Sequence, residues 1–139
     1  MYNNISLWHR AKSDIEVVRV LLKASFQDEL HLDIVAYHLQ QAVEKLMKYQ
    51  LEMHGVVPSR THDLLVLADQ FDKINLAVPQ WIIDNAETFR DYATKTRYGT
   101  DLLASKRKLM ELLKWIEAYL EENKPIETDE AGVKGIEEE

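Results

Sequence analysis

Residues 37–48 carry a stripe of polar side chains that could bind a charged group. Four of them recur at steps of three and four residues: His38, Gln41, Lys45 and Lys48. On a helix this spacing puts all four on one face, where their N–H groups suit a phosphate or a carboxylate. The same spacing also fits a solvated helix face with an ordinary ion pair between Glu44 and Lys48. The sequence alone leaves both interpretations open.

Residues 58–64 form a second segment, in which hydroxyl and carboxylate oxygens flank a histidine. The side-chain oxygens of Thr61 and Asp63 are suited to accept hydrogen bonds from the free amides at a helix start. A capped turn therefore explains both residues without any ligand. His62 is a weak catalytic candidate, because an imidazole can transfer protons or simply cap the turn.

A third segment, residues 89–99, ends in arginine and tyrosine side chains. On a helix Arg90, Thr94 and Arg97 share one face, and Tyr98 follows directly. Residues 90–108 hold six basic and two acidic residues, a local net charge of +4 in a chain whose net charge is −7. Guanidinium groups bind phosphates bidentately and tyrosine rings stack on bases, so a nucleotide or an RNA strand is the expected ligand. Surface ion pairs are the alternative explanation of this cluster.

Apolar residues recur at steps of three and four along most of the chain, which predicts helices. Five stretches show this period: about 6–26, 32–54, 64–71, 79–99 and 101–123. Gly55 supplies a left-handed stop after the second stretch, and Pro79 suits the first turn of the fourth. The expected capping residues are, in chain order, Asn4 or Ser6, Ser59 or Thr61, and Thr100 or Asp101.

Short connections between amphipathic helices favour an all-α, up-and-down bundle of four or five helices. We expect one domain over residues 1–123. The segment 124–139 holds two lysines and six acidic residues, with proline, two glycines and no apolar period. It is expected to be an acidic, disordered tail.

Composition excludes several classes of function. The 139 residues contain no cysteine, so disulfides, thiolate zinc sites and cysteine nucleophiles are ruled out. Glycine-rich phosphate loops and zinc-protease motifs are also missing, and neither a metal nor a cofactor is expected. No apolar run approaches the roughly 20 residues that span a bilayer, and no signal peptide is apparent. We therefore expect a soluble, cytoplasmic protein without a membrane partner.

The three segments, in this order and spacing, resemble the HEPN family of helical domains. Its members carry a Gln-Gln-Ala-x-Glu-Lys-like helix, a Thr-His-Asp-Leu turn and an Arg-Tyr ending, found here at residues 40–45, 61–64 and 97–98. The resemblance spans about residues 7–119. It implies a four- or five-helix bundle, similar to the helical domain of nucleotidyltransferases and usually homodimeric. It also implies pairing with a minimal nucleotidyltransferase, often in a toxin–antitoxin-like arrangement.

A large branch of that family cleaves RNA with an arginine followed, after four to six residues, by a histidine. Starting from Arg90, the permitted positions hold Lys95, Thr96 and Arg97, and no other arginine has a histidine at this spacing. The nuclease motif is therefore missing, and the chain is not expected to be an enzyme of that type.

The leading hypothesis is a homodimeric module that binds a nucleotide or RNA. Its predicted contact residues are Arg90, Arg97, Tyr98, Lys45, Gln41 and Lys48. One alternative is an RNase toxin with a displaced catalytic histidine, for which Arg90 and His62 are the weak candidates. The other is a purely structural partner of a nucleotidyltransferase.

Overall fold

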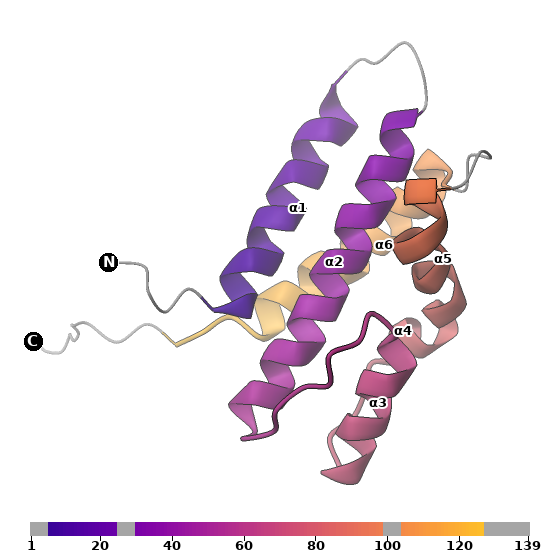
Figure 1. Cartoon of the computed structure of the whole chain (residues 1–139). Coiled ribbons are helices and arrows are strands. Elements are labelled where there is room, and N and C mark those ends of the chain that lie inside the picture. Colours follow the sequence, from indigo (N-terminus) through magenta and orange to yellow (C-terminus); the bar gives the residue numbers. More distant parts are fainter. Residues whose placement is uncertain (1–5, 25–29, 99–103, 127–139) are drawn as a thin grey trace, which may run out of the picture.

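The computed structural model describes residues 6–24, 30–98 and 104–126, which form six α-helices and no strand (Figure 1). The helices are α1 (Leu7–Lys23), α2 (Leu30–Met53), α3 (Leu64–Lys73), α4 (Gln80–Asp84), α5 (Ala86–Tyr98) and α6 (Lys106–Glu122). The all-α prediction is confirmed. None of these helices combines the length and the apolar character needed to cross a membrane.

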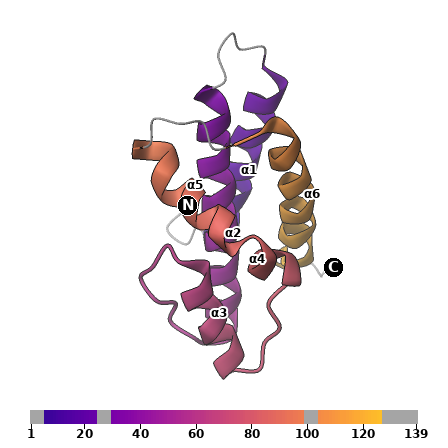
Figure 2. The same ribbon diagram turned by 90° about the vertical axis from the view of Figure 1, so that its right-hand side faces the viewer.

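Helix α2 is the centre of the bundle. It runs antiparallel to α1, and α5 and α6 pack against its other sides, with α3 near its C-terminal end (Figures 1 and 2). This position explains the composition of α2, which is apolar over most of its circumference. Its side chains Leu39, Val43 and Leu46 have no exposed surface, and each contributes roughly 1.5–3 kcal/mol by leaving water.

The remaining helices close the core around α2. Ile15 of α1, Phe71 of α3, Phe89 of α5 and Ile116 of α6 are fully buried in it. The indole Nε1 of Trp8 donates to the carbonyl of Leu120 over 2.8 Å, which ties the start of α1 to the end of α6. Because α2 is held on all these sides, its backbone is a fixed support for the polar side chains that it carries.

Some helix boundaries agree with the sequence prediction. Ser6 caps α1 by accepting from the backbone N–H of His9 over 3.3 Å. Gly55 follows α2 with φ +76°, a left-handed conformation that glycine adopts without strain. The first predicted helix is three residues too long, because α1 ends at Lys23 and not at Phe26.

Other boundaries agree only in part. The capped turn predicted from Thr61 and Asp63 is confirmed, but the cap of α3 is Asp63 and not Ser59 or Thr61: its carboxylate accepts from the N–H of Leu65 over 2.9 Å. Thr61 supports this cap from outside the helix by accepting from the N–H of Asp63 over 3.0 Å. Helix α6 starts at Lys106 with Ser105 as its cap, and not at Thr100 or Asp101. Those two residues, Asn4 and residues 127–139 of the predicted tail lie outside the described residues.

The single helix predicted over residues 79–99 is in fact two helices, α4 and α5. Asn85 separates them with φ −112° and ψ 14°, and its side-chain amide donates to the carbonyl of Trp81 over 2.7 Å. Asparagine competes with the helix for backbone partners in this way. Apolar periodicity does not reveal the break, because Ile82, Ala86 and Phe89 still point into the core on both sides of it.

Candidate functional site

The carboxylate of Glu44 links α2 to the turn before α3. Its side chain is only 6% exposed. Its Oε1 accepts from Gln40 Nε2 and from His62 Nδ1, each over 3.0 Å, and its Oε2 pairs with Lys48 Nζ over 3.0 Å. The predicted Glu44–Lys48 ion pair is therefore confirmed. Two of the three sequence segments thus meet at one buried carboxylate.

The surroundings of Glu44 keep it ionised. Burial acts to raise the pKa of this carboxyl, but the hydrogen bonds from His62, Gln40 and Lys48, together with the charge of Lys48, outweigh burial and lower the pKa below its ordinary value. At neutral pH Glu44 is therefore ionised, and both of its carboxylate oxygens accept hydrogen bonds from other side chains.

This carboxylate fixes the orientation and the tautomer of His62. Because an ionised carboxylate only accepts, the proton between the two groups belongs to Nδ1 of the imidazole. In the uncharged ring the lone pair then lies on Nε2. The side chain of His62 is 72% exposed, so this second nitrogen is accessible from solvent.

Arg90 of α5 reaches the residue that follows this histidine. Its Nη2 is 3.5 Å from Oδ2 of Asp63, the residue that follows His62, and the Arg90 side chain is 50% exposed. The other oxygen of Asp63 is occupied by the cap of α3. Thr94, on the same face of α5, donates its hydroxyl to the carbonyl of Arg90 over 3.0 Å. The third sequence segment thus reaches the same surface as the second.

A second buried carboxylate, Asp14 of α1, repeats the arrangement around Glu44. Its Oδ1 accepts from His38 Nδ1 over 2.9 Å, and its Oδ2 pairs with Lys45 Nζ over 2.6 Å. The two histidines differ in access, because the side chain of His38 is only 29% exposed. Each cluster therefore holds one lysine and one histidine on one acidic group.

These contacts show where the predicted site residues lie. Lys45 and Lys48 are paired with carboxylates of the chain itself, and the Gln41 side chain donates to Gln40 Oε1 over 2.8 Å. Arg97 and Tyr98 lie in the last turn of α5, and their side chains are outside the described residues. The structure brings Arg90 and His62 to one surface.

Two residues of the site escaped the sequence prediction. Gln40 is fully buried and donates to Glu44, and Asp14 is buried on α1. Asp14 did leave a signal, since it follows Ala11 by three residues and precedes Val18 by four. A carboxylate in the apolar register of a helix is expected to be paired inside the fold.

Within the described ranges, no group of three histidine, aspartate or glutamate side chains is arranged to hold a metal ion. What the site offers is a helical bundle with an exposed histidine and an exposed arginine beside the buried, ionised Glu44. A family model described as the HEPN domain matches residues 6–125, and the chain belongs to this family. Searches of curated proteins and of solved structures gave no match.

Proposed function

We propose that this HEPN domain binds the phosphate groups of a nucleotide or of RNA through Arg90 and His62. The observation that carries the proposal is the exposure of Arg90 and His62 where α2, α5 and the turn before α3 meet. The guanidinium of Arg90 donates to a phosphate directly, and Nε2 of His62 does so when the ring is protonated. The contact of Arg90 with Asp63 is long and half exposed, and such pairs contribute about 0–1 kcal/mol. A phosphate can therefore replace Asp63 as the partner of the guanidinium at little cost.

In this proposal the lysines of α2 support the site and do not contact the ligand. Lys45 and Lys48 neutralise Asp14 and Glu44, and removing them from those acids would leave buried charges unpaired. Arg97 stays part of the proposed site, because it follows Arg90 by seven residues on α5 and so shares its face. Tyr98 and Gln41 are proposed at its edge.

Calorimetric titration with ATP and with a short RNA tests the binding proposal. Arg90→Ala should weaken binding by about tenfold, since one charge-assisted phosphate contact is lost, and should lower the salt dependence. Arg10→Ala is the matched control, because Arg10 is an exposed arginine on α1, which packs mainly against α2. Equal affinities for the two variants, or no binding by the wild type, would refute the proposal.

The family resemblance extends the proposal to a homodimer that works with a minimal nucleotidyltransferase in a toxin–antitoxin-like pair. Light scattering of the purified chain tests the first part, and a monomeric mass would contradict the dimer. Co-expression with a minimal nucleotidyltransferase tests the second part, since a stable pair should purify together.

A second candidate function is RNA cleavage without a metal, favoured by the Glu44–His62 pair. Nε2 of His62 would take the proton of a 2′-hydroxyl, whose oxygen then attacks the adjacent phosphorus. The P–O5′ bond breaks, giving a 2′,3′-cyclic phosphate and, after protonation by the imidazolium, a 5′-hydroxyl. Arg90 would stabilise the negative charge on the phosphate oxygens as this occurs.

A fluorogenic RNA and its all-DNA counterpart test this second function. His62→Gln should lower the cleavage rate at least about 100-fold, the usual contribution of a general base. His38→Gln is the matched control, since His38 has the same carboxylate–lysine surroundings but little exposure. If the wild type cuts no RNA, this second function fails and the binding proposal is unaffected.

A further inference from the structure

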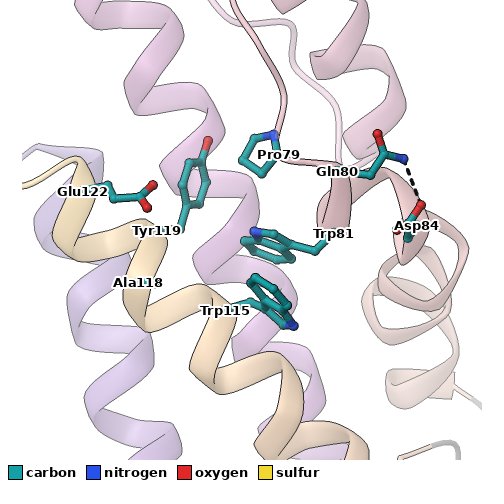
Figure 3. A pocket seen from close by; sticks show the side chains of 8 residues that line it. All are labelled: Pro79, Gln80, Trp81, Asp84, Trp115, Ala118, Tyr119 and Glu122. Atoms are coloured by element: carbon teal, nitrogen blue, oxygen red, sulfur yellow. Dashed lines mark hydrogen bonds between the residues drawn. The ribbon is translucent and has the colours of Figure 1, made fainter.

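A hollow of about 490 Å³ lies between α4 and α6, formed by residues that take no part in the candidate site (Figure 3). On α6, Trp115, Tyr119 and Glu122 follow one another at steps of four and three residues, so they share one face. On α4, Trp81 and Asp84 are three residues apart. The ring of Trp81 reaches α6 and stacks on Trp115, whereas Asp84 lies beside Gln80 on the α4 side of the hollow (Figure 3).

Three aromatic rings form the apolar part of this hollow. The rings of Trp81 and Trp115 are nearly parallel, at 20° with their centroids 6.2 Å apart, while Tyr119 meets Trp81 edge-on with centroids 5.9 Å apart. Tyr119 is held in place by the hydrogen bond from its hydroxyl to Gln50. Trp115 is 48% exposed, which leaves a wide indole surface that none of the described residues covers.

The charged groups around the rings are acidic. Asp84 and Glu122 line the hollow, and no lysine or arginine within 6–24, 30–98 or 104–126 lines it with them. Asp84 accepts from Gln80 through one oxygen over 2.9 Å, and Glu122 makes no ion pair with any described residue. A phosphate would be repelled here, whereas a cation would be attracted by both carboxylates and by the faces of the indoles.

We propose that this hollow binds an arginine side chain of a protein partner. A guanidinium is planar, so it stacks on an indole and still directs its N–H groups sideways to carboxylates. The aliphatic stem of the arginine would cover the half-exposed Trp115, which a free small cation cannot do. The proposal concerns a surface separate from Arg90 and His62, and it holds whether or not those residues bind phosphate.

Nitrogen–proton correlation spectra test the proposal, because the chain has three tryptophans and hence three indole N–H signals. The probes are acetyl-Gly-Arg-Gly-amide and the same peptide with citrulline, which is neutral and nearly the same shape. The arginine peptide should move the signals of Trp81 and Trp115. Trp8 is an internal control, because its buried N–H donates to Leu120 and should not respond. The citrulline peptide should bind at least about fivefold more weakly.

Matched variants connect this binding to the acidic rim. Glu122→Gln should weaken the arginine peptide by about threefold or more, since one charged partner is lost. Glu121→Gln removes the same charge from an exposed neighbour that does not line the hollow, and it should bind like the wild type. The proposal would be overturned if the arginine and citrulline peptides gave equal shifts, or if the signals of Trp81 and Trp115 did not move. Equal weakening by the Glu122→Gln and Glu121→Gln variants would also overturn it. If free spermidine bound as tightly as the arginine peptide, the claim that the cation comes from a protein partner would be refuted.

Discussion

Replacing Glu44 by glutamine tests whether this buried carboxylate holds the turn before α3 against α2. Three side chains donate to it: Gln40, Lys48 and His62. Glutamine keeps the shape but removes the charge and replaces one acceptor oxygen with a donor NH₂ group. At least one of the three donors then loses its partner, so the folded chain should become less stable.

The expected loss is about 2 kcal/mol in the free energy of unfolding. A hydrogen bond to a charged group contributes about 1.5–3 kcal/mol, and three of them would sum to more than 4 kcal/mol. The sum is an overestimate because His62 is 72% exposed and turns to water at little cost. Gln40 is fully buried, so its side-chain amide cannot turn to water in the same way. For a domain of this size, 2 kcal/mol lowers the melting temperature by about 8 °C.

Urea unfolding followed by circular dichroism measures this loss, and its pH dependence checks the cause. The pKa of Glu44 is lower in the folded chain than its ordinary value of 4.5. Its ionisation therefore stabilises the fold above about pH 4.5, and this contribution disappears as the pH falls through the lowered value. The stability difference between wild type and variant should be full at neutral pH and shrink in acid, because protonated glutamate resembles glutamine.

Glu52→Gln is the control, since Glu52 is an exposed acid on the same helix about two turns further on. It should change the free energy of unfolding by less than about 0.5 kcal/mol. A Glu44→Gln protein as stable as the Glu52→Gln protein would refute the reasoning. A stability difference that stays constant down to acid pH would also refute it.

Three further predictions concern the fold. Phe89→Ala should lower the free energy of unfolding by about 3–5 kcal/mol in urea titrations, because this fully buried ring leaves a cavity beside Trp81 and Tyr92. Gly55→Ala should cost about 1 kcal/mol in the same assay, because φ +76° strains any side chain although space is free there. Burial, and then the charge of Asp33, raises the pKa of Tyr92 to about 12. The folded chain therefore favours the neutral phenol, stability should fall as the pH rises above about 10, and Tyr92→Phe should reduce this alkaline loss in thermal melts.

Several features were predictable because they depend on residues close in sequence. The long helices α1, α2 and α6 follow from apolar residues at three- and four-residue steps. The Glu44–Lys48 ion pair follows from the four-residue spacing on one helix. The family assignment likewise came from short ordered motifs, and the family model over residues 6–125 agrees with it.

The break at Asn85 and the late start of α6 were not predictable in the same way. Both depend on which of several competing backbone partners each residue takes, and apolar residues continue in phase across the break. Asn85 turns its amide to Trp81, and Ser105 accepts from the N–H of Lys108 over 3.2 Å. Periodicity therefore gives the number of apolar stripes and not the number of helices.

The sequence by itself determined the helical class, the family and the residue types that the site contains. Only the tertiary structure decided which of them meet. Asp14 and Lys45 are 31 residues apart, Glu44 and His62 are 18 apart, and Asp63 and Arg90 are 27 apart. These pairs form because α1, α5 and the turn before α3 pack against α2, and no local spacing encodes that packing. The same packing pairs Lys45 with a buried acid and leaves Arg90 and His62 exposed, a difference that the spacing of the sequence does not reveal.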